Sequence, residues 1–231
     1  MSNPNSPDPQ RPIRSYVIRS GRQTDAQRYA LDNYWRDHVI PYKAAPLPID
    51  EVFTSADRLV VEIGFGMGDS LLQMAQQNPQ SLFVGIDVHR PGVGKLLHGI
   101  VENKLTNLKI VCHDAKEVLA HCFTAESIDR VLILFPDPWP KKRHHKRRLI
   151  QTEFVELIMT KLKPGGEIHL ATDWEAYAEQ MLVVMQSITG LHNAMGPNEY
   201  WSQPQRPETK FERRGKKLGH GVWDLLFSKQ H

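Results

Sequence analysis

The strongest constraint on the fold is a regular alternation of short apolar runs with segments of helical periodicity. The apolar runs are Leu59–Ile63, Leu82–Asp87, Leu108–Cys112, Ile128–Phe135, Glu167–Thr172 and Val222–Phe227. The helix-like segments between them begin near Ser70, Gly92, Ala115, Lys146 and Trp174. Because strands that alternate with helices pair in parallel, this pattern predicts an α/β fold with a doubly wound, mostly parallel sheet. A further helix is predicted from Thr24 to about Val39.

Length and composition are compatible with one large domain. The chain has 231 residues, of which 40% are hydrophobic and 24% charged, as in an ordinary globular protein. Residues 1–20 begin with a proline-rich dozen and are predicted to be a flexible tail, and residues 21–231 to form a single domain. No apolar run approaches the ~20 residues of a membrane span, and no secretory signal is expected. With only two cysteines, a reduced, cytoplasmic protein is expected.

Basic residues gather in patches on an otherwise acidic chain. The net charge is only +3, yet residues 141–148 read KKRHHKRR and include no acid. Residues 11–22 and 206–217 are two further basic segments. Such concentrated positive charge predicts an anionic partner, and nucleic acid is the first candidate.

A glycine-rich turn follows the first apolar run. Residues 60–70 read VVEIGFGMGDS, which is an apolar strand, three glycines at alternate positions and a helix start. The glycines let the backbone adopt positive φ and approach a ligand closely, although any tight strand-to-helix turn can have this pattern. Asp87 and Asp114 end the next two runs, where one acid alone would be interpreted as a helix cap. Because ligands bind at the carboxyl edge of open α/β sheets, the three positions together predict a cofactor site there.

The glycine spacing points to S-adenosylmethionine (SAM). G-x-G-x-G differs from the G-x-G-x-x-G of dinucleotide dehydrogenases, and the chain has no P-loop motif. SAM has no pyrophosphate but carries an ammonium group, which an acid beside the loop would favour. The segment resembles the first motif of class I methyltransferases. That resemblance implies that Glu62, Gly64, Gly66 and Gly68 meet the methionine end of SAM, that Asp87 holds the ribose and that Asp114 lies near the adenine.

The fourth apolar run leads directly into the basic residues. Residues 131–148 read VLILFPDPWPKKRHHKRR. Since prolines cannot continue a central strand, the chain must leave the sheet at its carboxyl edge, which places Asp137 beside the cofactor site. A basic run alone is usually a solvated surface or a targeting patch. Directly behind Asp137, it predicts that phosphates are held near the reaction centre.

The segment PDPWPKKRHHKRR closely resembles the signature of bacterial tRNA (guanine-N7)-methyltransferases. The resemblance extends from about Arg14 to Phe227 and includes EIGFGMG, GIDVH, HDA, ATDW at 171–174 and TKFERRG at 209–215. It implies a Rossmann-like class I methyltransferase sheet, SAM as cofactor, tRNA as substrate and the guanine at position 46 of the variable loop as target. Together with the irregular residues 198–221, it predicts that Val222–Phe227 is an antiparallel strand near the sheet edge.

The chemistry of guanine N7 agrees with this resemblance. N7 has an in-plane lone pair and no proton at neutral pH, so it can attack a sulfonium methyl group without a strong general base. Methylation puts positive charge on the base and acidifies N1–H, so a carboxylate that accepts from N1–H would select guanine and stabilise the transition state. Asp137 and Asp173 both end strands at the expected edge. We assign Asp137 the catalytic role within the cofactor pocket and Asp173 a supporting role in base recognition.

The resemblance also implies substrate contacts. Lys141, Thr209, Lys210, Phe211 and Glu212 would complete the substrate site. The predicted RNA-binding residues are Arg143, His144, His145, Lys146, Arg147 and Arg148. Phe211 is predicted either to stack on a base or to anchor its loop. Because A-form RNA hides N7 in its deep major groove, the target guanine is expected in a loop or an opened tertiary fold.

Other interpretations remain open from the sequence. An adenine-N6 methyltransferase would carry a second proline before the aromatic residue of the Asp137–Trp139 motif, and a non-catalytic RNA-binding protein would not need the intact acids. No metal site is expected, since the Cys and His residues at 112–113 and 121–122 match no zinc spacing. Trp139 and Trp174 either line the pocket or pack beneath it. Both a monomer and a homodimer are compatible with the sequence.

Overall fold

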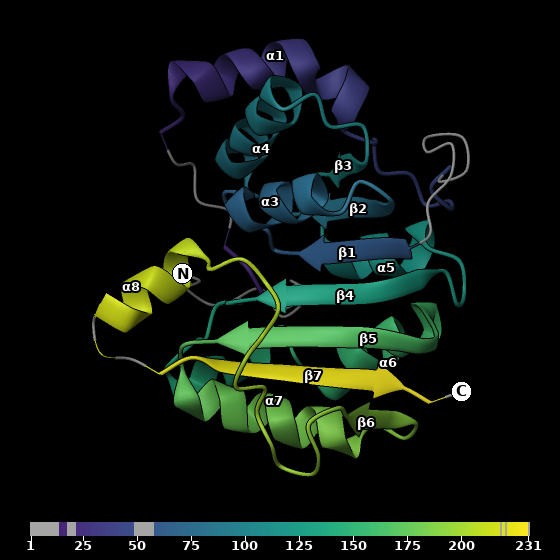
Figure 1. The fold of residues 1–231 in the computed structure, drawn as a ribbon, viewed down its shortest axis with the longest axis vertical. Coiled ribbons are helices and arrows are strands. Elements are labelled where there is room, and N and C mark those ends of the chain that lie inside the picture. The colour runs from purple at the N-terminus through teal and green to yellow at the C-terminus, as the bar shows by residue number, and fades with distance from the viewer. Residues whose placement is uncertain (1–13, 18–21, 49–57, 218, 220, 231) are drawn as a thin grey trace, which may run out of the picture.

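The computed structural model describes residues 14–17, 22–48, 58–217, 219 and 221–230, which form one seven-stranded sheet in the order β3-β2-β1-β4-β5-β7-β6 (Figure 1). The strands are β1 (Arg58–Ile63), β2 (Ser81–Ile86), β3 (Leu108–Val111), β4 (Ile128–Leu134), β5 (Leu162–Thr172), β6 (Leu191–Asn193) and β7 (Trp223–Lys229). Strands β1 to β5 run parallel, whereas β7 is antiparallel to both β5 and β6. The strand order reverses between β1 and β4, and ligands bind at such switch points.

Helices cover both faces of the sheet. They are α1 (Asp25–His38), α3 (Asp69–Gln77), α4 (Arg90–Glu102), α5 (Ala115–Cys122), the 3₁₀ helix η1 (Lys142–Arg147), α6 (Thr152–Lys161), α7 (Glu175–Ser187) and α8 (Lys210–Lys217). Helices α1, α3 and α4 supply the core of one face, and α5, α6 and α7 that of the other. Helix α8 lies beside the carboxyl ends of β4 and β5 (Figure 1). The candidate site is therefore bordered by the ends of central strands and by α8.

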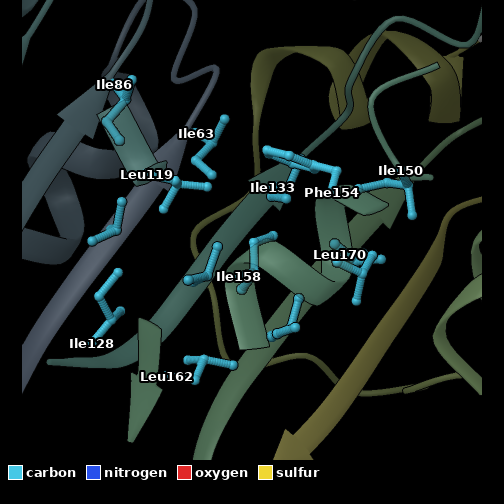
Figure 2. Close-up of a cluster of buried hydrophobic side chains, with 14 of the residues drawn as sticks. Ile63, Ile86, Leu119, Ile128, Ile133, Ile150, Phe154, Ile158, Leu162 and Leu170 are labelled. Atoms are coloured by element: carbon cyan, nitrogen blue, oxygen red, sulfur yellow. The ribbon is translucent and has the colours of Figure 1, made fainter. Parts of the chain in front are cut away.

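Burial on both faces explains the continuous apolar runs of the sequence. In β1, Val61 belongs to the core shared with α5, α6 and α7, whereas its neighbour Val60 belongs to the core shared with α3 and α4. Figure 2 shows the first of these cores, in which Leu119 of α5 and Phe154 of α6 lie over residues of the central strands. The two cores hold the strand ends, and hence the site, in a fixed arrangement.

The predicted strands and the antiparallel C-terminal strand are confirmed. Strand β7 lies between β5 and β6, one position from the sheet edge. Strand β6 was not predicted, because its three residues are too few to show a periodicity. Strand β5 begins at Leu162 rather than Glu167, because Pro164, Gly165 and Gly166 resemble a turn in sequence although they continue the strand here.

The helix predicted to begin near Lys146 begins at Thr152 instead. Residues 142–147 form the short 3₁₀ helix η1, and the backbone at Gln151 is extended, with φ −132° and ψ 157°. Ile150 is fully buried and donates its N–H to the Tyr177 hydroxyl at 3.1 Å. The chain is thus anchored between η1 and α6, which separates the basic run from the helix.

Helix α4 begins against the glycine-rich turn at a contact that only glycine fits. A Cβ at Gly92 would lie 1.8 Å from the carbonyl oxygen of Gly66, which is backbone. At Gly99 of the same helix, a Cβ would meet only the end of the Leu72 side chain, which can move.

We expect Gly92→Ala to lower the free energy of unfolding by about 1–3 kcal/mol, because the backbone must shift to accept the methyl group. Gly99→Ala is the matched control and should cause a smaller loss. Urea denaturation of both variants measures the difference. Equal losses would show that the contact between Gly92 and Gly66 does not constrain the turn.

Candidate active site

The glycine loop, residues 64–68, joins β1 to α3 at the carboxyl edge of the sheet. Gly64, Gly66 and Gly68 have φ values of +75°, +60° and +76°, in the left-handed region that glycine tolerates. Gly64 donates its N–H to the carbonyl of Ile86 at 2.8 Å, and Gly66 donates its N–H to Asp87 Oδ2 at 2.8 Å. The alternate glycines are therefore required by the backbone, and the loop is tied to the end of β2.

Asp87 supports the backbone on two sides. Its Oδ2 accepts from Gly66, and its Oδ1 accepts the N–H of His89 at 2.8 Å. Burial raises the pKa of Asp87, and these hydrogen bonds offset part of the rise. Because a carboxylate has about four acceptor positions, both oxygens can accept further bonds from a ligand.

Glu62 is a buried acid, and one of its carboxyl oxygens has no partner among the described residues. The residue is only 3% exposed, and its Oε2 has no hydrogen-bond partner among the described residues. Burial, reinforced by the nearby charge of Asp87, raises the pKa of Glu62 to about 8. Glu62 lines a cavity of about 280 Å³ together with the glycine loop. A cationic group in that cavity would satisfy the carboxylate.

A second cavity of about 310 Å³ adjoins the first. Its lining includes Asp87, Asp114 and Asp137, and the two cavities share Gly64, Gly66, His89 and Phe135. Because they share these residues, the two cavities adjoin at the glycine loop and together form one site. Its acids come from the ends of three strands, as predicted, so the space suits an extended ligand with a cationic end and hydroxyl donors.

Two residues with strained backbone conformations flank Asp137 in the chain. Phe135 and Trp139 have φ values of +55° and +44°, which are uncommon for bulky side chains. Phe135 is held there by its N–H, which donates to the carbonyl of Ala171 at 2.8 Å. Asp137 itself is exposed and lines the second cavity. Strain of this kind persists only where the surrounding structure enforces it, and it clusters at functional sites.

Residues 14–17, which fall within the predicted tail of residues 1–20, lie against this loop. Trp139 Nε1 donates to the Ser15 carbonyl at 3.1 Å, and Arg147 Nε donates to the Arg14 carbonyl at 3.2 Å. Tyr16 hydrogen-bonds to Asp114, and burial together with that carboxylate raises the pKa of Tyr16. These contacts hold residues 14–17 in place. The rest of the predicted tail, 1–13 and 18–20, lies outside the described residues.

The C-terminal loop brings two predicted substrate residues to the first cavity. Thr209 and Lys210 line it together with Arg214 of α8. Glu212 does not line either cavity; it is 8% exposed and forms an ion pair with Arg206 at 2.5 Å. The side chain of Phe211 lies outside the described residues, so both of its predicted roles stay predictions. The loop therefore offers a hydroxyl group and two cations beside Glu62.

Three other predicted residues lie near the same edge but outside these two cavities. Asp173 directly follows β5 and is half-buried, and Lys141 is exposed at the start of the basic run. Trp174 is 38% exposed and is not among the residues that line these two cavities. Trp139 packs in the loop, where its ring lies 4.0 Å from the guanidinium of Arg147.

The basic run presents most of its cations to solvent. Lys141, Lys142, Arg143 and Lys146 are exposed, whereas His144, His145 and Arg147 are half-buried. His144 makes an edge contact with the Trp139 ring at 5.9 Å. The exposed cations follow Asp137 by four to nine residues. Arg147 of the same run donates to Arg14, whose neighbour Ser15 lines the second cavity.

The prediction that Arg148 binds RNA is wrong. Arg148 is 3% exposed, and its Nε donates to the Pro138 carbonyl at 2.8 Å. Its NH1 donates to Gln180, and its guanidinium lies 4.7 Å from the centre of the Tyr177 ring. Arg148 therefore ties the Asp137 loop to α7 and is not available to a phosphate.

Comparison with known proteins identifies the family. A family model described as "Putative methyltransferase" matches residues 56–225. A tRNA (guanine-N(7)-)-methyltransferase from Serratia proteamaculans (strain 568) is 53% identical over 221 residues, covering 95% of this chain and 92% of that protein. The chain belongs to the tRNA (guanine-N7)-methyltransferase family. The family resemblance predicted from the sequence is confirmed.

Solved structures of lower identity share the fold of this family member. The 16S rRNA methyltransferase KamB has a TM-score of 0.58 at 17% identity, covering 79% of this chain and 93% of that one. A mutant 16S rRNA (adenine(1408)-N(1))-methyltransferase with cosubstrate SAM, from Catenulisporales acidiphilia, has a TM-score of 0.55 at 17% identity, covering 81% and 93%. The class I methyltransferase fold predicted from the sequence is confirmed.

Two observations on the described residues concern membrane helices and metal sites. Among the described residues, no helix is long and apolar enough to cross a membrane. Within the same residues, no group of three or more His, Cys, Asp or Glu side chains could hold a metal ion. The acids at the cavities are instead separated along the strand ends.

Glu62 makes the stability of the ligand-free methyltransferase depend on pH. Between about pH 4.5 and about pH 8, the unfolded chain releases the Glu62 proton while the folded protein keeps it. The folded state therefore loses stability as pH rises through this window, at up to about 1.4 kcal/mol per pH unit.

We expect Glu62→Gln to lack this loss, because an amide does not ionise. Its free energy of unfolding relative to the wild type should rise by a few kcal/mol between about pH 5 and about pH 8. Urea denaturation at the two pH values measures the change, with Glu156→Gln at an exposed position of α6 as control. A difference that stays constant with pH would contradict the elevated pKa.

Proposed function

We propose that this protein transfers the methyl group of SAM to N7 of guanine in tRNA, at position 46 of the variable loop. The arrangement of acids around the two adjoining cavities carries the proposal. Glu62 is buried beside the first cavity, whereas Asp87, Asp114 and the exposed Asp137 line the second. The exposed cations of η1 follow Asp137, where they would contact tRNA phosphates.

The residues of the two cavities fit SAM group by group. The unpartnered Glu62 oxygen suits an ammonium group, and Lys210 and Arg214 in the same cavity suit a carboxylate. Asp87 would accept from the ribose hydroxyls, and Asp114 would border the adenine. When bound, SAM supplies a methyl group that its sulfonium makes electrophilic.

Asp137 would supply orientation and charge rather than act as a general base. The bond from N7 to the methyl carbon forms as the carbon–sulfur bond breaks, and no proton leaves N7. Positive charge moves from sulfur onto the purine, and N1–H becomes more acidic. Asp137, accepting from N1–H and the exocyclic amine, would stabilise this charge most strongly in the transition state. Asp173 at the same edge and Lys141 would assist in holding the nucleotide.

The substrate would be a tRNA whose target guanine is presented outside a regular duplex. In an A-form helix N7 lies in a deep, narrow major groove, where the side chains of the two cavities could not reach it. The exposed cations of η1 would hold the backbone while the base enters beside Asp137. We place this activity in the cytoplasm, where tRNA is modified.

Mass spectrometry of nucleosides from tRNA incubated with the protein and SAM tests this function. The expected product is 7-methylguanosine. Asp137→Asn keeps the shape and removes the charge, and it should slow the single-turnover rate by about 100-fold or more at saturating tRNA and SAM. Glu153→Gln, an exposed acid of α6, is the matched control and should keep the wild-type rate.

Each alternative function gives a different product in that assay. Methyladenosine would show that the target base is adenine and not guanine. The absence of any methylated nucleoside would favour a non-catalytic RNA-binding protein. A wild-type rate for Asp137→Asn would remove Asp137 from the reaction centre.

We expect the double substitution of Arg143 and Lys146 by Ala to weaken tRNA binding and leave SAM affinity unchanged. Both residues are exposed on η1, so they would contribute salt-dependent phosphate contacts. The slope of log K against log salt should become shallower by about 0.7–0.9 per lost contact. Lys104→Ala is the control, because Lys104 is exposed beyond the far end of α4. An unchanged slope in the double variant would place the RNA surface elsewhere.

A further inference from the structure

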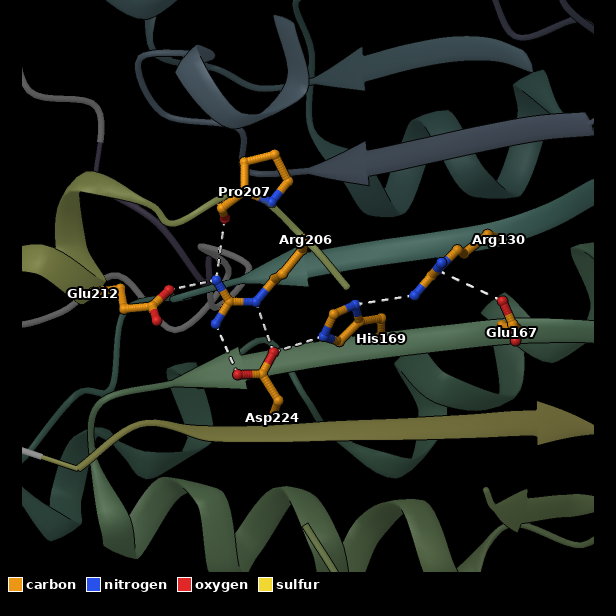
Figure 3. Close-up of polar contacts among 7 residues, drawn as sticks. All are labelled: Arg130, Glu167, His169, Arg206, Pro207, Glu212 and Asp224. Carbon is orange, nitrogen blue, oxygen red and sulfur yellow. Dashed lines mark hydrogen bonds and ion pairs between the residues drawn. The ribbon is translucent and has the colours of Figure 1, made fainter. Parts of the chain in front are cut away.

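Arg206 is the centre of a buried polar network that links the C-terminal loop to the sheet (Figure 3). Its side chain is only 2% exposed. Nε and NH2 each donate to one carboxylate oxygen of Asp224 on β7 at 2.7 Å, the two-pronged geometry of strong Arg–carboxylate pairs. NH1 donates to Glu212 Oε2 at 2.5 Å and to the Pro207 carbonyl at 3.3 Å. The guanidinium is thus bonded to a strand, to α8 and to the loop between them.

The network continues along the sheet, away from α8. Asp224 Oδ1 also accepts from His169 Nε2 at 2.6 Å, and His169 Nδ1 accepts from Arg130 NH2 at 3.2 Å. Burial lowers the pKa of His169, and this effect, with the charges of Arg130 and Arg206, outweighs the opposing effect of Asp224. The neutral ring therefore donates at one nitrogen and accepts at the other. Arg130 then pairs with Glu167 at 3.6 Å. Figure 3 shows these side chains in a line across β7, β5 and β4.

Interactions inside the network favour the ionised forms of Asp224 and Arg206. Hydrogen bonds from His169 and Arg206 outweigh the effect of burial and hold the pKa of Asp224 below its ordinary value. Asp224 and Glu212 raise the pKa of Arg206 against the effect of burial. Both shifts favour the charged forms of Arg206 and Asp224, so the pair acts as a structural link.

One side of Arg206 leads to the first cavity. Thr209 and Lys210, which line that cavity, follow Arg206 by three and four residues. Glu212 lies in the first turn of α8, and its N–H donates to Thr209 Oγ1 at 3.1 Å. The ion pair between Arg206 and Glu212 therefore fixes the start of α8 and the cavity residues together.

The other side of Arg206 leads to the Asp137 loop. The guanidinium lies 5.4 Å from the centre of the Phe135 ring. Phe135 lines both cavities, has a strained φ and lies two residues before Asp137. Apolar packing does not fix this region alone, since residues 205–207 border a separate cavity of about 540 Å³. The polar bonds of Arg206 supply the constraint that packing leaves out.

We propose that Arg206 is a positioning residue for methyl transfer. It sets the start of α8 and the Asp137 loop relative to each other, through Glu212 and Phe135, while Asp224 anchors it to the sheet. It acts through these residues and touches neither SAM nor the guanine. The inference rests on the proposed function, because it assigns Arg206 to the placement of groups that this reaction needs.

Arg206→Lys tests the proposal against Glu167→Gln as a matched control. Lysine keeps the charge but lacks the planar fork, so it cannot keep the two parallel bonds to Asp224 while it also bonds to Glu212. Glu167→Gln weakens the far end of the same network, remote from both loops. For each variant we would measure Tm, the Kd of SAM, the Kd of tRNA and the single-turnover rate at saturating concentrations of both.

We expect Arg206→Lys to lower the single-turnover rate by about tenfold or more, because a displacement of about 1 Å suffices for such a loss. The two Kd values should change much less than the rate. Glu167→Gln should lower Tm and keep the wild-type rate. If Arg206→Lys is not folded at the assay temperature, Asp224→Asn replaces it, since it weakens the fork while keeping the volume of the side chain, and the same rate loss is expected.

Three outcomes would overturn the positioning role. They are a wild-type rate in the folded Arg206 or Asp224 variant, a loss confined to the Kd values, and an equal rate loss in Glu167→Gln. The wild-type protein in the same assay separates the proposed function from the proposed role of Arg206. If it makes no 7-methylguanosine, the proposed function fails; if it does while the variant is unaffected, only the role of Arg206 fails.

Discussion

The hydrogen bond from the Gly66 N–H to the Asp87 carboxylate is the contact on which the cavities depend. It ties the end of β2 to the loop between β1 and α3. The carbonyl of the same Gly66 lies against Gly92, so the start of α4 constrains the loop from the other side. Asp87 also adds its charge to the effect of burial that raises the pKa of Glu62. Asp87 therefore sets both the shape of the glycine loop and the affinity of Glu62 for a proton or another cation.

The chain separates its charges by depth. Acids from the strand ends line the cavities, and the exposed cations of η1 stand outside them. Lys210 and Arg214 at the first cavity depart from this separation. So do two buried arginines held by hydrogen bonds inside the fold, Arg148 to the Asp137 loop and Arg206 to Asp224. Both connect a loop at the carboxyl edge to a helix or strand. The buried Arg148 and Arg206 thus fix loops at the carboxyl edge of the sheet, whereas the exposed cations of η1 face solvent, where a polyanion such as tRNA could bind them.

Sequence patterns predicted what repeats along the chain and missed what depends on a single contact. The strands, the glycine loop and the acids at the strand ends follow from periodicity and from topology, because parallel strands deliver their carboxyl ends to one edge. Arg148 lies in a run of similar residues, and only its burial separates it from Arg147. Tyr16 was missed because its neighbours have the composition of a tail, and Arg206 because its partners are on α8 and β7. No local pattern encodes such contacts between distant segments.

A nucleophile that carries its own lone pair changes what an active site must do. Because guanine N7 needs no general base, a site that methylates it has to supply placement and electrostatic stabilisation. The structure concentrates its constraints accordingly: left-handed backbone at Phe135 and Trp139, a segment at 14–17 bonded to Trp139, and buried arginines at either side of the loop. Asp137 itself is exposed between these fixed neighbours. A carboxylate on a rigid support can remain solvated before the base arrives and still meet it in one orientation, so rigidity belongs to the residues around Asp137 rather than to Asp137 itself.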